Sequence, residues 1–271
     1  MKKFTLSILF GFLSIPLFAQ AGYTVKFAKV DAKYSEKPEP TAEFWKDATP
    51  LKIGLSPQQM TQPSLKESSV ANLTFRSVHN SDTIFVLLEW ADNAKDASLE
   101  TEKMTDGCAI QFPIKDFKKT SPFMGGKDSP VMIGQWKAVW QVDAEKGFQR
   151  IKDVYPNTWV ENTDLFGQNT ALLSKNHASN ENRKTPAQLA LAEGFGSLAL
   201  QPADGLKAWG VWENKVWKVA FAMKKKNGKL NLENGQNTGI SFAVWDGAKG
   251  NVGSRKNILM SWQPILLEAG K

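Results

Sequence analysis

Cysteine and histidine are almost missing from this chain of 271 residues, which contains one cysteine and two histidines. A single cysteine excludes an internal disulfide, a thiolate zinc cluster and covalent attachment of a cofactor through C-x-x-C-H. Cys108 lies in the apolar run 108–112, so we expect a buried, unreactive thiol. His79 and His177 lack the H-x-x-x-H and H-x-x-E-H spacings, so zinc-dependent hydrolysis is not supported.

Motifs for other common chemistries are missing as well. The sequence has no G-x-S-x-G, no P-loop and no G-x-G-x-x-G, which argues against serine hydrolysis and nucleotide binding. The short turn 194–196 follows a predicted helix, which is the wrong order for a dinucleotide site. Catalysis by a pair of carboxylates is not excluded by the sequence, because acidic residues are plentiful. No motif, however, brings two of them together.

Long hydrophobic runs are absent except at the start, where the pattern is that of an export signal. Two lysines precede the apolar stretch 4–18, which is too short to span a bilayer comfortably. A small-x-small sequence ends at Ala21 and fits the cleavage rule. We therefore expect a signal peptide over 1–21 and a mature, periplasmic chain that begins at Gly22 and has no membrane span. A retained membrane anchor is the alternative.

Positive charge is in slight excess and is spread along the chain, with 34 basic and 27 acidic residues. The tight basic cluster 224–226 is followed by Asn-Gly, so we expect a solvated hairpin turn. Without a clustered patch, nucleic-acid binding is not indicated. A pI of about 9.3 favours docking to an acidic redox partner.

Short β-type segments separated by Gly, Asn and Asp turns dominate the rest of the chain. The predicted strands are 24–30, 51–55, 70–78, 83–90, 108–113, 134–142, 208–213, 216–223, 239–245 and 257–266. This density of strands and turns predicts an all-β fold, a single β-sandwich with a few short helices. The helices are a turn at 43–48 and a helix over 187–193 that begins after Thr-Pro and ends at a glycine.

No linker-like change of composition divides the mature chain, so we expect one domain over 22–271. The polar segment 145–184 is predicted to leave the sandwich as a long loop that serves function or contacts a partner. The chain also carries ten tryptophans. Their simplest interpretation is sandwich core; the alternatives are walls around a flat macrocycle or stacking platforms for sugars.

Two glycine-containing loops present side chains that can ligate a metal. The loop 121–127 places Met124 between Phe123 and two glycines, and the Gly-rich loop after the strand 239–245 delivers Lys256. A thioether is a soft donor that favours ferrous iron, whereas lysine ligates only as the neutral amine. Its usual pKa of about 10.4 must then be lowered by burial. Taken alone, such a methionine is usually a core gap-filler and such a lysine is usually solvated.

Several segments along the mature chain occur in the order of a known family. They are 44–48, 88–90, 109–113, 123–125, 135–138, 192–196, 242–247, and Lys256 followed by 261–262. Together they resemble the haem b-binding gamma subunits of periplasmic molybdopterin enzymes. That family includes subunits of ethylbenzene and dimethylsulfide dehydrogenases, selenate, chlorate and nitrate reductases, and nitrite oxidoreductases.

The resemblance implies a β-sandwich of the haem-binding type that also occurs in secreted cytochrome domains. It implies a non-covalent haem b whose iron is held by one methionine and one lysine, at positions matching Met124 and Lys256. Lys249 stays an alternative for the lysine, because loop alignment is loose. We expect the haem to occupy an apolar slot at an end of the sandwich, lined with aromatic rings.

The function that the resemblance implies is that of a non-catalytic electron-transfer subunit. Electrons would pass between an iron–sulfur subunit, itself joined to a molybdopterin catalytic subunit, and a periplasmic cytochrome. The alternative is a secreted carbohydrate-binding module, which predicts solvent-facing tryptophans in a row and no chromophore. A periplasmic sensor or chaperone-like domain without a cofactor is a third possibility.

Overall fold

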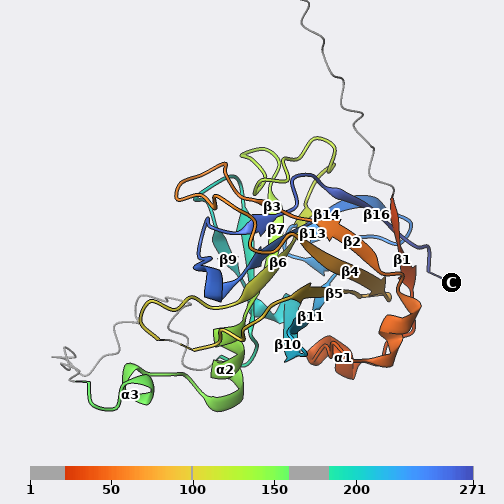
Figure 1. Cartoon of the computed structure of the whole chain (residues 1–271). Helices are drawn as coiled ribbons and strands as arrows, with labels where there is room; N and C mark the ends of the chain where they lie inside the picture. The colour runs from red at the N-terminus through yellow and green to blue at the C-terminus, as the bar shows by residue number, and fades with distance from the viewer. Residues whose placement is uncertain (1–21, 99, 159–182, 271) are drawn as a thin grey trace, which may run out of the picture.

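The computed structural model describes residues 22–98, 100–158 and 183–270. The predicted signal peptide, Trp159, His177 and most of the segment 145–184 lie outside these ranges. Strands dominate the described chain, and the short helices lie at its periphery (Figure 1). Within the described ranges, no helix is long and apolar enough to cross a membrane.

The strands form two facing layers. The first layer contains β2 (Leu51–Gly54), β4 (Asn72–His79), β5 (Thr83–Ala91), β11 (Val216–Lys224) and β10 (Leu206–Glu213). The second contains β16 (Gln263–Leu267), β14 (Asn237–Trp245), β6 (Gly107–Pro113), β7 (Val131–Lys137), β8 (Ala187–Ala192) and β9 (Ala199–Gln201). Neighbouring strands within each layer are antiparallel, and the predicted β-sandwich is confirmed.

The first strand of the described chain joins the two layers. β1 (Tyr23–Phe27) runs parallel to β16 along its first half and parallel to β4 along its second half. Two short strands, β3 (Ser56–Pro57) and β15 (Asn257–Ile258), pair with each other, and β15 pairs with β14. A small separate hairpin is formed by β12 (Lys226–Asn227) and β13 (Leu230–Asn231). The sandwich is therefore one continuous sheet that folds over on itself.

Helical segments are short and lie in the connections. The α-helices are α1 (Lys33–Glu36), α2 (Ala138–Lys146) and α3 (Ile151–Val154). The 3₁₀-helices are η1 (Glu43–Asp47), η3 (Ala203–Gly205) and η4 (Gly247–Lys249). η1 confirms the predicted turn at 43–48.

Aromatic side chains from both layers fill the space between them. The ring centroids of Phe75 and Phe242 lie 5.0 Å apart, and those of Trp136 and Trp217 lie 4.9 Å apart. Trp90, Trp136 and Trp217 are buried almost completely, as the core interpretation of the tryptophans predicts. Each such ring removes roughly 150–250 Å² from water, which makes these contacts the main source of inter-layer stability. Cys108 is free and fully buried, and burial raises the pKa of its thiol, so the prediction of an inert cysteine is confirmed.

Both predicted hairpins are present. β4 and β5 pair antiparallel on either side of the turn near Asn80, and β10 and β11 pair through their whole length. The second turn uses Asn214 and Lys215 with φ of 52° and 59°, the left-handed pair that matches strand twist in a two-residue hairpin. Sequence alternation and turn chemistry together determine these elements.

Three local predictions are wrong. The segment 187–193 is a strand, not a helix, because β8 pairs with β7 and buries Ala187 and Leu189 in the core. Its Ala- and Leu-rich composition favours a helix, but tertiary pairing outweighs that weak preference. The strand predicted over 134–142 ends at Lys137 and continues as α2. The segment predicted as one strand over 257–266 is split into β15 and β16.

The basic cluster 224–226 is also not fully solvated. Lys224 and Lys226 are exposed, but the Lys225 side chain is buried, and its Nζ donates a hydrogen bond of 2.6 Å to Asn234 Oδ1. Burial lowers the pKa of Lys225. The hydrogen bond of Lys225 therefore joins the two ends of the 225–234 segment, which includes the β12–β13 hairpin.

A substitution at Gly210 in β10 tests the packing between the two layers. A Cβ at this position would lie 2.5 Å from Trp136 Cζ2, and the backbone of Gly210 is already held by Gln141 through two hydrogen bonds of 2.7 and 2.8 Å. We expect Gly210→Ala to lower the free energy of unfolding by about 1–3 kcal/mol in chemical denaturation. The matched control is Gly54→Ala in β2, where a Cβ meets nothing within 4 Å. Equal stability of the two variants would contradict this packing.

Candidate functional site

A pocket of about 460 Å³ lies on the outer face of the second layer. The strands that form its floor point alternate side chains in opposite directions, so Cys108 and Ile110 enter the core while Ala109 and Gln111 face the pocket. The cavity that Met124 and Lys256 line therefore lies on a face of the sandwich, whereas the sequence favours a haem slot at one of its ends. Its size is typical of a small-molecule or cofactor site.

The floor of the pocket is made of small and polar side chains from adjacent strands. Strand register places Ala243 opposite Ala109, Ala109 opposite Gln135, and Ile133 opposite Ala190. All five line the pocket. Three of these residues are alanines, whose short side chains leave the floor nearly flat. A flat ligand can therefore approach the sheet closely.

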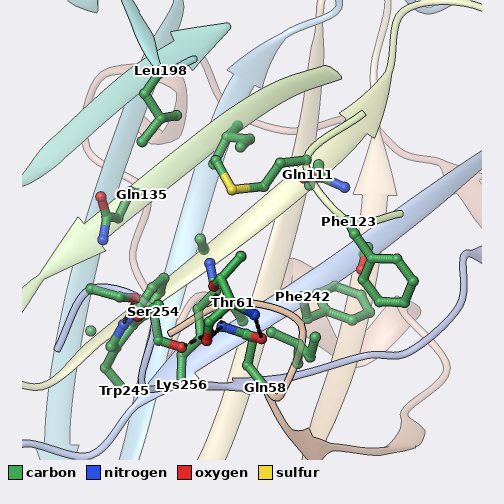
Figure 2. Close-up of a pocket in the computed structure, with 18 of the residues that line it drawn as sticks. Gln58, Thr61, Gln111, Phe123, Gln135, Leu198, Phe242, Trp245, Ser254 and Lys256 are labelled. Atoms are coloured by element: carbon green, nitrogen blue, oxygen red, sulfur yellow. Dashed lines mark hydrogen bonds between the residues drawn. The ribbon is translucent and has the colours of Figure 1, made fainter. Parts of the chain in front are cut away.

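Loops from four parts of the chain form the walls. They contribute Gln58 to Thr61, Phe123 with Met124, Phe195 to Leu198, and the loop that follows β14 (Figure 2). In this view Lys256 lies beside Trp245 and Ser254 on one side of the pocket, whereas Leu198 lies on the opposite side. Within the described ranges, the aromatic residues of the lining are Phe123, Phe195, Phe242 and Trp245, and most of the described tryptophans are buried in the core instead.

Met124 is held in the pocket wall by an unusual backbone. Its φ is 63°, a left-handed conformation that residues other than glycine rarely adopt, and its carbonyl accepts a hydrogen bond of 2.9 Å from Gly194 N. Gln111 on the pocket floor donates a hydrogen bond of 2.8 Å to the Pro122 carbonyl of the same loop. Residues so constrained concentrate at functional sites, where the surrounding structure supports the strain.

The backbone at Lys256 is held in place by its own hydrogen bond and by those of neighbouring residues. Its carbonyl accepts a hydrogen bond of 2.9 Å from Gln58 N, and Gln58 Nε2 donates to the Ser254 carbonyl at 2.9 Å. The next residue, Asn257, is completely buried and bonds through its side chain to Ser68, Ser69 and Asn251. The backbone that carries Lys256 is therefore tied to the 58–69 segment on one side and to its own loop on the other.

The Lys256 side chain is half-buried, so its amine is partly removed from water. Its Nζ lies 5.2 Å from the centroid of the Trp245 ring. Burial lowers the pKa of Lys256 to about 8, because the charged ammonium loses hydration that the apolar walls do not replace. A neutral amine, which is the form that can ligate a metal, is therefore accessible near neutral pH.

The alternative lysine occupies a different environment. Lys249 is the last residue of η4, is exposed, and does not line the pocket. Met124 and Lys256, which are far apart in the sequence, do line the same pocket. The structure thus brings together the two residues named by the resemblance and leaves Lys249 outside.

A second basic group lies at the pocket wall. Lys137 lines the pocket, its Nζ lies 4.7 Å from the centroid of the Trp140 ring, and the guanidinium of Arg183 lies 4.5 Å from the centroid of the same ring. Burial and the nearby Arg183 lower the pKa of Lys137. The pocket wall therefore contains a second lysine in addition to Lys256.

Some pocket residues were not found from the sequence. Gln111 interrupts an otherwise apolar strand and faces the pocket, so strict attention to alternation identifies it as a candidate. Lys137 ends a strand whose polar members alternate with core residues and carries the same signal. Gln58 carries no such signal, because its role depends on a contact with the distant Ser254.

The family model for ethylbenzene dehydrogenase matches residues 42–257, and the chain belongs to this family. The gamma subunit of chlorate reductase from Ideonella dechloratans is 24% identical over 229 residues, covering 82% of this chain and 77% of that protein. A protein described as the haem subunit of a respiratory nitrate reductase, ORF7 of Haloferax mediterranei, is 24% identical over 101 residues, or 37% of each chain.

A solved structure also resembles the fold. The family 9 carbohydrate-binding module of Caldicellulosiruptor kristjanssonii, in complex with cellotriose, aligns over 93% of this chain and 95% of that one. Its TM-score is 0.45 and its sequence identity is 8%, values too low to carry an argument about function.

The comparisons confirm the family to which the sequence segments point. The two curated relatives are named as the gamma subunit and the haem subunit of reductases. The chain therefore belongs with the non-catalytic subunits of such complexes rather than with their catalytic chains.

A substitution at Gly125 tests the conformation of the loop that carries Met124. Its φ is 70°, and a Cβ would lie 2.6 Å from the Ser129 carbonyl oxygen and 3.3 Å from that of Ala192. We expect Gly125→Ala to lower the free energy of unfolding by about 1–3 kcal/mol, as measured by denaturant titration. Gly126→Ala is the control, since its nearest contact is Ser129 Oγ at 3.4 Å. If both variants are as stable as the parent, the loop does not depend on Gly125.

Proposed function

We propose that this chain is the haem b-binding electron-transfer subunit of a periplasmic molybdopterin oxidoreductase complex, with Met124 and Lys256 as the axial ligands of the haem iron. The observation that carries the proposal is that these two side chains, on separate loops, line one largely apolar pocket. Family membership supports the cofactor class, and the named haem subunit among the relatives supports it further.

The donor set fits a non-covalent haem. The single buried cysteine leaves no covalent route, and His79, the histidine within the described ranges, does not line the pocket. Met124 offers a thioether from a constrained loop, and Lys256 offers an amine whose pKa is already lowered to about 8. The alanine-rich floor accommodates a flat ring, and the basic side chain of Lys137 supplies a partner for its carboxylates.

When bound, haem supplies a one-electron couple at its iron. The residues of the chain set the conditions for that couple. Met124 supplies a soft donor, which favours the ferrous state and raises the potential. Lys256, held beside Trp245 in a largely apolar pocket, would supply a nitrogen donor as the neutral amine.

We infer the partners and compartment from the same relatives. The named reductase subunits support assembly with a molybdopterin catalytic subunit. We propose that an iron–sulfur subunit exchanges electrons with this chain and that a periplasmic cytochrome is the second redox partner. We further propose that the first 21 residues direct export and that residues 22–271 form one domain.

The carbohydrate-binding alternative depends on exposed tryptophans. Within the described ranges, no tryptophan is exposed, and Trp90, Trp136 and Trp217 lie in the core. The row of solvent-facing rings that this alternative requires is therefore not supported in this part of the chain.

Substitution of the proposed ligands tests the cofactor and its ligation together. We expect the purified wild-type chain to give a six-coordinate b-type spectrum in reduced-minus-oxidised difference spectroscopy. Met124→Ala and Lys256→Ala each remove one donor and are expected to shift that spectrum or abolish haem retention.

The matched controls for this test are Met260→Ala and Lys249→Ala, both at exposed positions outside the pocket lining. They are expected to leave the spectrum unchanged. A spectrum altered by Lys249→Ala but not by Lys256→Ala would transfer the axial role to Lys249. Absence of a Soret band after reconstitution with haem would reject the proposed cofactor.

The affinity for haem is expected to depend on pH through Lys256. Because its pKa is about 8, binding below that pH must release a proton, whereas binding above it does not. The affinity should rise by about tenfold per pH unit up to pH 8 and then level off. Haem titrations of the wild type and of Lys256→Gln across this range provide the measurement. The pH dependence should disappear in the variant; an equal slope in both proteins would contradict the assignment.

A further inference from the structure

Three buried carboxylates meet at one edge of the sandwich, away from the lining of the pocket. Asp92, Asp106 and Asp246 are 5%, 0% and 7% exposed, and one oxygen from each lies within 4.8 Å of the others. Asp92 directly follows β5 of the first layer, whereas Asp106 precedes β6 and Asp246 follows β14 of the second layer. The cluster therefore spans both layers.

The hydrogen bonds around these carboxylates leave acceptor capacity unused. Asp106 is well supplied: Oδ1 accepts from Gly247 N at 2.8 Å, and Oδ2 accepts from Asp96 N at 2.7 Å and Trp217 Nε1 at 2.9 Å. Asp246 Oδ1 accepts from Lys249 N at 3.1 Å. These bonds fix the orientation of two carboxylates but bring only neutral donors to them.

Asp92 provides an independent sign of a missing ligand. Its Oδ1 accepts from Ala94 N at 3.1 Å, but its Oδ2 is completely buried and forms no hydrogen bond. The nearby indole Nε1 of Trp90 is also buried without a hydrogen bond of normal geometry. A buried carboxylate oxygen without a donor of normal geometry loses its hydration without full replacement unless a positive group faces it.

No cationic side chain in the described ranges forms an ion pair with these carboxylates. Among the described residues, none of the three aspartates forms an ion pair, and Lys249 acts on Asp246 only from a longer distance. Burial, with a smaller contribution from neighbouring carboxylates, raises the pKa of Asp106 to about 7 and that of Asp92 to about 6. Three carboxylates this close repel one another whenever they are ionised.

We propose that Asp92, Asp106 and Asp246 form a binding site for a divalent cation, and that this cation is calcium. The donors are all oxygen atoms, which suits a hard cation and does not suit metals that prefer imidazole or thiolate. Calcium accepts irregular oxygen geometry, whereas magnesium demands a near-octahedral shell and keeps several waters. A site lined by side chains that are almost fully buried has little room for such a hydrated ion.

The position of the site gives the cation a structural role. It joins the end of β5 to the ends of β6 and β14 and so connects the two layers where no strand pairing does. Asp246 also begins the loop that leads to Lys256. Its backbone amide donates a hydrogen bond of 3.3 Å to Asn251 Oδ1, and its carbonyl accepts one of 3.1 Å from Asn251 N. The cation would therefore stabilise the start of that loop. The site itself does not depend on the haem proposal.

The test is calcium binding to the purified full chain after treatment with a chelator and desalting. Isothermal titration with calcium chloride should give one site per chain, and calcium should raise the midpoint of thermal unfolding measured by circular dichroism. Asp92→Asn keeps the Oδ1 acceptor but removes the charge, so it should weaken calcium binding by about tenfold or more. The same variant should be more stable than the wild type in chelator, because it relieves repulsion.

Asp47→Asn is the matched control, since Asp47 is exposed and lies outside the cluster; its response to calcium should equal that of the wild type. Asp246→Asn serves as a second variant if Asp92→Asn does not fold. Failure of calcium to bind or to stabilise the wild type would overturn the proposal, as would an undiminished response in the folded variants. An equal or greater response to magnesium chloride would overturn the assignment to calcium.

Discussion

A β-strand sends successive side chains to opposite faces of its sheet, and the second layer of this sandwich uses both faces. One face, with Ile110, Phe112 and Trp136, packs against the first layer. The other carries Ala109 and Ala243 and becomes the floor of the pocket. On β7, core residues therefore alternate with pocket-facing residues such as Gln135 and Lys137. The position, flatness and apolar character of the pocket all follow from this double burial.

Removal of Lys256 from water links the architecture to the proposed chemistry. A surface lysine stays protonated at neutral pH, whereas burial lowers the pKa of Lys256 to about 8. Such desolvation destabilises the ammonium, and the buried hydrogen bonds of Asn257 and Gln58 hold the backbone in place against that cost. The loop that carries Lys256 begins at Asp246, so the carboxylate cluster and the pocket wall share one segment of chain.

The parts of the fold governed by local rules were predictable from the sequence. Alternation and turn residues predicted both hairpins and, apart from β8, the longer strands, but not the short strands β3, β9, β12 and β13. The strand that begins at Ala187 was not predictable in this way, because an Ala- and Leu-rich run favours a helix. Only its pairing with β7 shows that it is a strand. Met124 and Lys256 were named only through family resemblance, since neither carries a local signal. The aspartate cluster could not be predicted, because its members come from three distant segments that only the folded sheet brings together.

The most direct test of the account is a crystal structure of the haem-loaded chain with anomalous data collected at the iron edge. The account predicts a single iron position in the pocket on the outer face of the β14–β6–β7–β8 layer. The sulfur of Met124 and the amine nitrogen of Lys256 should ligate it from opposite sides. An iron position outside this pocket, or inside it with other side chains as ligands, would contradict the central claim.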